Sequence, residues 1–184
     1  MKVLVVTGSM GSGKTTMIGE LSDLLASRAI AHAAIDIDAF GNAHDPLGAI
    51  DLGAVAYRNV AAAVGNYASR GVTTFVLAGA IESAAELTQL HDAVGTTDVV
   101  VCRLGAPVAV MQDRIRLREP GMWQQKYVDR VAILEGVLDQ AGLEDFAVAN
   151  DGARPITEVA EEILQRAGWI PPARQAGHKP VEIR

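Results

Sequence analysis

The sequence predicts a three-layer α/β/α fold with a five-stranded parallel sheet. Two observations lead to this prediction. Five short apolar runs lack the polar–apolar alternation of half-exposed strands, which is typical of strands covered on both faces. Longer stretches with helical periodicity separate these runs, and strands that alternate with helices at this spacing form parallel sheets with helices on both sides.

Each expected element has its own boundary signals. Gly, Asp or Asn flank the apolar runs, and a Glu-Pro-Gly breaker follows the fourth helical stretch. The expected strands are Val3–Thr7, Ala33–Ile37, Thr73–Ala78, Asp98–Arg103 and Phe146–Ala149. The expected helices are Lys14–Arg28, Asp51–Arg70, Glu82–Val94, Pro107–Arg118, Gln124–Ala141 and Pro155–Arg166.

Length and composition predict one domain with a tail. The 184 residues suffice for a single core, which we expect over residues 1–168, followed by a proline-containing tail over 169–184. We expect Trp169 to pack on the domain. The alanine-rich stretch Gly53–Val64 suits either a core or a dimer surface, so both a monomer and a homodimer fit the sequence.

Charge and targeting signals limit the classes of partner that we expect. The net charge of −6 and the few aromatic residues disfavour nucleic acid as a partner. No apolar run reaches the ~18 residues of a membrane span, and we expect no cleaved signal peptide before the first strand. The single cysteine, Cys102, lies in an apolar run and is expected to be a buried strand residue. We therefore expect a cytoplasmic protein without a membrane partner.

The stretch GSMGSGKT matches the pattern G-x-x-x-x-G-K-[ST] between the first strand and the first helix. Glycines there let successive backbone N–H groups point at a phosphate, and the helix N-terminus favours negative charge. We expect the lysine to contact the β- and γ-phosphates and the following threonine hydroxyl to bind Mg²⁺. The expected nucleotide-binding residues are Gly8, Ser9, Met10, Gly11, Ser12, Gly13, Lys14, Thr15 and Thr16.

The second strand ends in two carboxylates, Asp36 and Asp38. In an extended chain this spacing directs both side chains to one side, at the sheet edge where such folds bind ligands. The alternative is that one or both residues cap the following turn. The third strand, by contrast, ends in Ala-Gly-Ala-Ile, without the carboxylate that switch and motor proteins with this loop usually place there.

The phosphate loop and the Asp-x-Asp sequence resemble the small P-loop metabolite kinases, which include shikimate, gluconate and adenylyl-sulfate kinases. At motif level the resemblance covers most of residues 1–168. It implies the nucleoside-monophosphate-kinase-like fold, strand order 2-3-1-4-5, and ATP and Mg²⁺ as cofactors. It also implies that Asp36 lies near the metal or acts as the base, and that Asp38 holds the acceptor.

Further acceptor residues follow from the same resemblance. Arg58 resembles an arginine that points at an anionic acceptor, although a solvated helix arginine explains it nearly as well. Gly79 resembles the small-residue turn that an acceptor approaches, and it could equally be a strand-end glycine. Phe40, with Arg58, offers part of the aromatic and arginine pair expected for a second adenine. The sequence does not identify the acceptor.

A short lid around residues 118–125 is the third likeness. Arg118 and, next, Arg114 resemble arginines that neutralise charge on the transferring phosphoryl group. The alternative is a solvated basic helix face paired with Asp113 and Glu119. After the last strand, a loop that resembles the adenine-contacting loop of these kinases offers Asn150, Asp151 and Gly152, which turn and cap roles also explain.

Two functions remain from different classes. The first is a kinase that transfers the γ-phosphoryl group of ATP to a hydroxyl of a small metabolite or nucleotide. The second is a nucleotide-binding regulatory or switch module without transfer, which the missing carboxylate on the third strand favours. An ATPase that acts on a macromolecule is disfavoured, because the chain has no second domain and no basic face.

Overall fold

The computed structural model describes residues 1–41, 43–118 and 120–172. It confirms the predicted fold: a five-stranded sheet in the order β2-β3-β1-β4-β5, with every neighbouring pair parallel. The strands are β1 (Lys2–Thr7), β2 (Ala33–Asp36), β3 (Thr74–Ala78), β4 (Val99–Gly105) and β5 (Phe146–Ala149). The helices are α1 (Lys14–Ser27), α2 (Ile37–Phe40), α3 (Leu52–Ala68), α4 (Ala84–Val94), α5 (Val108–Arg118), α6 (Gln124–Ala141) and α7 (Ile156–Arg166).

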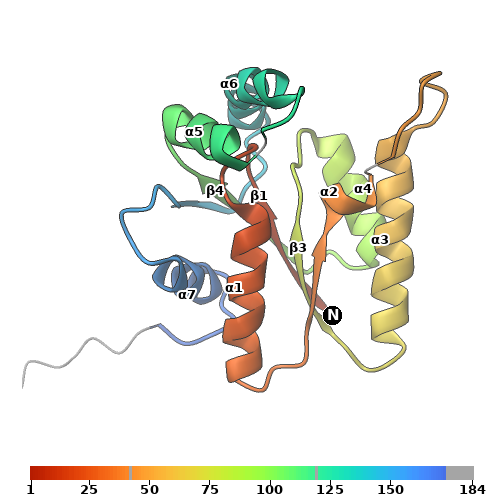
Figure 1. Ribbon diagram of the computed structural model, residues 1–184. Helices are drawn as coiled ribbons and strands as arrows, with labels where there is room; N and C mark the ends of the chain where they lie inside the picture. The colour runs from red at the N-terminus through yellow and green to blue at the C-terminus, as the bar shows by residue number, and fades with distance from the viewer. Residues whose placement is uncertain (42, 119, 173–184) are drawn as a thin grey trace, which may run out of the picture.

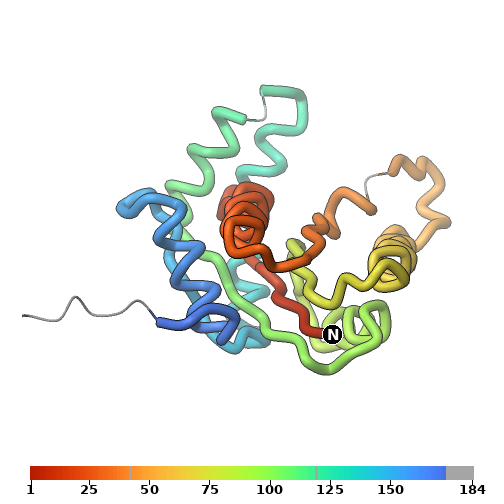
Figure 2. The backbone as a smooth tube through the Cα atoms, turned by 90° about the horizontal axis from the view of Figure 1, so that it is seen from below, coloured from red at the N-terminus to blue at the C-terminus, as the bar shows by residue number. Residues whose placement is uncertain are grey.

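Alternate residues of the central strand β1 enter two different cores. Leu4 and Val6 pack with α1 and α7 on one face of the sheet, while Val3 and Val5 pack with α3 and α4 on the other. Figures 1 and 2 show these helix pairs on opposite sides of the sheet. Burial on both faces explains why the strands read as continuous apolar runs.

A third, smaller core lies beside the phosphate loop. Four buried side chains from α5 and α6 form it, and Met10 of the loop packs against them. The four are Met111, Ile115, Val128 and Val131. The two helices stand together beyond the carboxyl ends of β1 and β4 (Figure 1), so this core fixes them next to the loop.

The end of β2 differs from the prediction. The strand stops at Asp36, and Ile37 begins the short helix α2, so Asp38 does not continue an extended strand. Asp36 caps this helix, because its Oδ1 accepts a hydrogen bond of 3.1 Å from the backbone N–H of Asp38. The capping alternative is therefore correct for one oxygen of Asp36.

The remaining expectations concern buried and terminal residues. Cys102 is fully buried in β4, where burial raises the pKa of its thiol to about 12. Trp169 packs against the α1–α7 core, and the ammonium group of Lys2 lies 4.7 Å from its ring centroid. Tail residues 173–184 lie outside the described residues. Within the described chain, no helix combines the length and apolar character of a membrane span.

Candidate functional site

Three glycines give the loop between β1 and α1 its shape. Gly8, Gly11 and Gly13 have φ values of 149°, 78° and 97°, which L-residues with a side chain rarely adopt. A Cβ atom on Gly8 or Gly11 would lie 2.3–2.4 Å from a backbone oxygen, of Leu104 or Met111 respectively. The glycines therefore allow both the curl of the loop and its close contact with neighbouring backbone.

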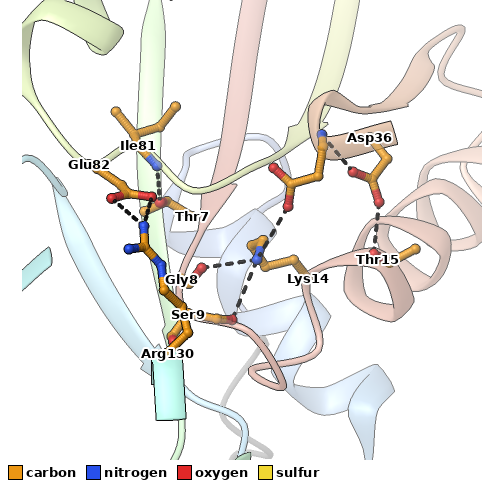
Figure 3. A network of polar contacts seen from close by, with 10 residues as sticks. Thr7, Gly8, Ser9, Lys14, Thr15, Asp36, Ile81, Glu82 and Arg130 are labelled. Carbon is orange, nitrogen blue, oxygen red and sulfur yellow. Dashed lines mark hydrogen bonds and ion pairs between the residues drawn. The ribbon is translucent and has the colours of Figure 1, made fainter. Parts of the chain in front are cut away.

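Lys14, the first residue of α1, points back over this loop (Figure 3). Its Nζ donates hydrogen bonds of 3.0 Å and 3.4 Å to the carbonyl oxygens of Gly8 and Ser9. The same nitrogen lies 3.7 Å from Oδ2 of Asp38. The lysine is buried, so its charge is held in place at the centre of the loop.

The loop fits a phosphate group. The buried hydroxyl oxygen of Ser12 has no hydrogen-bond partner within the described chain. It lies in a loop that presents a buried lysine and the N-terminus of the 14-residue helix α1. A phosphate oxygen would accept from such groups, because anions bind readily at helix N-termini.

Thr15 and Asp36 lie directly beside Lys14 (Figure 3). The Thr15 hydroxyl donates a 2.8 Å hydrogen bond to Oδ2 of Asp36, so both oxygens of Asp36 are engaged. Among the described residues, no cluster of three or more His, Cys, Asp or Glu could hold a metal ion by itself. A hydroxyl and one carboxylate fit Mg²⁺, which usually binds few protein oxygens together with substrate phosphates and water.

Three cavities adjoin around the loop. The largest, which we call the loop cavity, measures about 580 Å³ and is lined by Lys14, Asp36 and Arg118. It shares Gly13 and Arg118 with a cavity of about 310 Å³, the Asn150 cavity. It shares Asp38 with a cavity of about 260 Å³, the Tyr57 cavity. A ligand could thus extend from either side cavity across the phosphate loop.

Arg114 and Asn150 tie the loop to α5 and to the segment after β5. The Arg114 guanidinium donates to the carbonyl oxygens of Gly11 and Asn150 at 3.1 Å and 2.8 Å. The Asn150 side-chain amide donates to the carbonyl oxygen of Ser12 at 2.8 Å. Both side chains also line the Asn150 cavity. Arg114 therefore positions the loop backbone, a role that the sequence did not indicate.

The alternative that Arg114 and Arg118 belong to a solvated basic helix face is correct only in part. Asp113 pairs with Arg116 at 2.6 Å, on the exposed side of α5. Arg118 lines both the loop cavity and the Asn150 cavity, so the structure brings it to the predicted position near the phosphate loop. Glu119 lies outside the described residues.

Other predicted residues lie farther from the loop. Arg58 is exposed and lines a different hollow between α3 and α4, because its neighbour Tyr57 occupies the buried face of α3. Phe40 lines none of the three cavities, and the residue is 37% exposed. A Cβ on Gly79 would lie 3.0 Å from Cβ of Ile37, so close packing accounts for this glycine.

The three predicted residues in the loop after β5 also differ in whether they line a cavity next to the phosphate loop. Asp151 accepts a 2.9 Å hydrogen bond from the N–H of Ala153 and borders a hollow next to Arg103 rather than the Asn150 cavity. Gly152 has a φ of 92°, as its turn requires. Of the three expected residues in this loop, Asn150 alone lines a cavity that adjoins the phosphate loop, within the described chain.

Several residues at the site were missed at the sequence level. Arg130 of α6 forms an ion pair of 3.1 Å with Glu82, which follows β3, and this pair lies close to Gly8 and Ser9 (Figure 3). Tyr57 and Glu86, from α3 and α4, line the Tyr57 cavity together with Asp38. Helix periodicity in the sequence could have assigned Tyr57 to the buried face of α3. Which residues of other elements lie beside Tyr57 or Arg130 depends on tertiary packing, so helix periodicity does not predict it.

Comparisons with known proteins agree with this architecture. No family model and no curated protein matches the chain. Solved structures do match. A shikimate kinase from Acinetobacter baumannii, in complex with shikimate, is 20% identical with TM-score 0.58, over 90% of this chain and 92% of that chain. A gluconokinase from Sinorhizobium meliloti 1021 is 20% identical with TM-score 0.59, over 91% of each chain.

A third similar structure contains a nucleotide analogue. The APS kinase from Mycobacterium tuberculosis, in complex with AMPPNP and APS, is 20% identical with TM-score 0.57, over 89% of this chain and 95% of that chain. The chain therefore has the fold of the small P-loop kinases, as the resemblance in the sequence implied. At these identities the comparisons establish the fold and leave the acceptor undetermined.

Proposed function

We propose that this chain is an ATP-dependent kinase that transfers the γ-phosphoryl group to a hydroxyl of a small molecule. The observation that carries the proposal is the meeting of Lys14 with two carboxylates at one cavity. Lys14 Nζ lies 3.7 Å from Asp38, and Thr15 donates to Asp36 at 2.8 Å. A phosphate loop alone supports binding only, whereas a carboxylate that faces both cavities can also act on an acceptor hydroxyl.

The order of the cavities suggests how the substrates lie. We place the triphosphate in the loop cavity and the base in the Asn150 cavity, beside Asn150 and the loop that contains Asp151 and Gly152. The acceptor then occupies the Tyr57 cavity, which adjoins the loop cavity at Asp38. This order brings the γ-phosphate next to the acceptor without moving any strand.

The two carboxylates take different roles in this proposal. Both oxygens of Asp36 already accept hydrogen bonds, and with Thr15 it would hold Mg²⁺, which offsets phosphate charge when bound. The Asp38 side chain is 57% exposed and faces the loop and Tyr57 cavities. We therefore propose that Asp38 accepts the proton of the acceptor hydroxyl.

In the transfer step, the acceptor oxygen forms a bond to the γ-phosphorus while the bond from that phosphorus to the β–γ bridging oxygen breaks. The hydroxyl proton passes to Asp38, and ADP leaves. Lys14 and Arg118, which line the loop cavity, stabilise the negative charge on the moving phosphoryl group. Residues 118–125 would act as a lid that brings Arg118 closer and excludes water.

Acceptor-dependent formation of ADP tests this function. The full chain is incubated with ATP, Mg²⁺ and a panel of hydroxyl metabolites and nucleosides. Asp38→Asn should lower kcat on the order of 100-fold with little change in ATP affinity, because it removes the base and keeps the shape. Asp36→Ala should likewise reduce turnover far more than ATP affinity, and Lys14→Ala should abolish both.

The matched control is Asp23→Asn, the same charge change at an exposed position of α1. It should leave turnover unchanged. Unchanged rates in Asp36→Ala and Asp38→Asn would contradict the proposed mechanism. Tight ATP binding that no acceptor converts into ADP formation would instead favour a nucleotide-binding switch module.

A further inference from the structure

The Tyr57 cavity has an acidic lining. Its ionisable residues are Asp38, Tyr57 and Glu86, and the other lining residues are small or apolar. No lysine or arginine is among the described residues that line it. Charged groups from α2 and α4 thus face the same space of about 260 Å³, and both carry negative charge.

Tyr57 indicates that this space receives a polar ligand. The residue is 9% exposed and lines the cavity, and no hydrogen bond within the described part of the chain involves its hydroxyl. Burial, followed by the charges of Glu86 and Asp38, raises the pKa of the phenol above its usual value, so the hydroxyl stays protonated. Among the described residues this hydroxyl is not one of the fully buried oxygens that lack a partner, so solvent reaches it from the cavity, and a ligand hydroxyl that displaces this solvent would take over its hydrogen bonding.

The basic groups nearby are committed elsewhere. Lys14, which lies 3.7 Å from Asp38, is the group that contacts phosphate in the proposed function. Arg130 pairs with Glu82 at 3.1 Å, and Arg58 lines a different hollow. With a nucleotide on Lys14, Asp38 has no basic partner among the described residues that line the Tyr57 cavity.

Glu86 has a structural role as well as a negative charge. Its Oε2 accepts a 2.7 Å hydrogen bond from the N–H of Glu82, and it lies in the first turn of α4, where the helix dipole partly offsets its charge. Oε1 of Glu86 takes no part in this hydrogen bond. Glu86 can therefore accept a hydrogen bond from a ligand without losing its contact with Glu82.

Resting on the kinase activity proposed above, we propose that the Tyr57 cavity takes a polyhydroxylated acceptor that bears a protonated amine. Asp38 accepts from the reacting hydroxyl, Glu86 from the ammonium group, and the Tyr57 hydroxyl pairs with a further ligand hydroxyl. A carboxylate, sulfate or phosphate on the acceptor would instead meet two carboxylates. This assignment departs from the anionic acceptor that Arg58 suggested in the sequence.

Three probes with one carbon skeleton test this charge preference: glucosamine, glucose and gluconate. The dissociation constant of each is measured by NMR titration of the full chain loaded with AMPPNP and Mg²⁺. Glucosamine should bind on the order of tenfold more tightly than gluconate, a difference of ~1.4 kcal/mol, with glucose between them. Equal binding, the reverse order or no binding of glucosamine would overturn the proposal.

Two variants locate the preference. Glu86→Gln keeps an acceptor for the Glu82 N–H and removes the charge, so it should shrink the gap between glucosamine and gluconate. Asp92→Asn makes the same charge change on α4 but in the hollow beside Arg58, and it should leave the gap intact. Equal effects of both variants would assign the preference to overall charge and contradict a role of the cavity.

This experiment separates the two proposals, because binding next to AMPPNP requires no transfer. If the order of affinities holds but no acceptor yields ADP, only the kinase proposal fails. If gluconate, shikimate or adenylyl sulfate accepts phosphate from ATP, only the amine-bearing acceptor is excluded.

Discussion

Single residues in the phosphate loop show how local geometry and packing act together. Gly11 combines a φ of 78° with a backbone oxygen of Met111 that lies 2.4 Å from where its Cβ would be. Relaxation of the neighbour is difficult there, because the contact is to backbone of α5. Gly19, in contrast, lies on the exposed side of α1, with nothing within 4 Å of an added Cβ.

We therefore expect opposite effects of two identical substitutions. Gly11→Ala should lower the free energy of unfolding by about 2 kcal/mol or more, from backbone strain plus the contact with Met111. Gly19→Ala should raise it by ~0.5–1 kcal/mol, because alanine favours the helix. Urea unfolding of both variants measures the difference. Similar effects of the two substitutions would show that the loop conformation is not constrained as described.

The residue scale also shows what a sequence can predict about a site. The positions of Lys14 and Thr15 at the start of α1 could be predicted, because the spacing of glycines before them is typical of a loop that leads into a helix and can hold phosphate. The prediction that Asp36 and Asp38 lie together at the carboxyl end of β2 is correct, but its reason is wrong. A helix capped by Asp36, and not an extended strand, brings the two residues together. Arg130 and Glu86 were missed, because their proximity to the site depends on how α6 and α4 pack across the sheet.

At the scale of elements, α6 is fixed to the sheet by an ion pair that the sequence did not suggest. The Arg103 side chain on β4 is 10% exposed and pairs with Glu135 at 2.9 Å, while Asp139 and Glu144 lie at 2.6 Å and 3.6 Å. One buried oxygen of Glu135 has no partner within the described chain. The carboxylate thus depends on Arg103 for charge compensation.

Removal of this arginine should be costly. Arg103→Met should lower the free energy of unfolding by ~2–3 kcal/mol, because it leaves the half-buried Glu135 carboxylate without its ion pair. The double variant Arg103→Met/Glu135→Met should recover most of that loss. Arg28→Met serves as the control: Arg28 pairs with Glu161 at the surface, so it should cost less than ~1 kcal/mol. Chemical denaturation measures all three, and no recovery in the double variant would contradict the ion-pair explanation.

Element order was the most predictable feature above the residue scale. Apolar runs identified all five strands, because the central strands β1 and β3 contribute buried residues to both cores, while the edge strands β2 and β5 contribute buried residues to one core each. The helix α2 was missed, since its four residues are too few for a periodic pattern and its start depends on the Asp36 cap. The strand order came from the resemblance to kinases, because apolar patterns do not specify which strands are neighbours.

For the whole molecule, we expect binding of the proposed nucleotide to stabilise the folded chain. The proposed triphosphate site joins the loop after β1, the end of β2 and helix α5, so a bound nucleotide contacts groups that come together only in the folded chain. At a nucleotide concentration 100 times Kd, this linkage stabilises the folded state by ~2.7 kcal/mol. For a chain of this length, the gain corresponds to a rise in Tm of roughly 5–10 °C.

Thermal unfolding with AMPPNP and Mg²⁺ tests this link without any acceptor. The wild-type chain should show the rise in Tm, and Lys14→Ala should lose it, because the lysine at the centre of the loop is removed. Lys2→Ala is the matched control: this lysine lies at the opposite end of β1, over Trp169, so the variant can lower the basal Tm but should keep the full rise. A rise that survives in Lys14→Ala would place the nucleotide outside the loop cavity, and the proposed order of the three cavities would then be wrong.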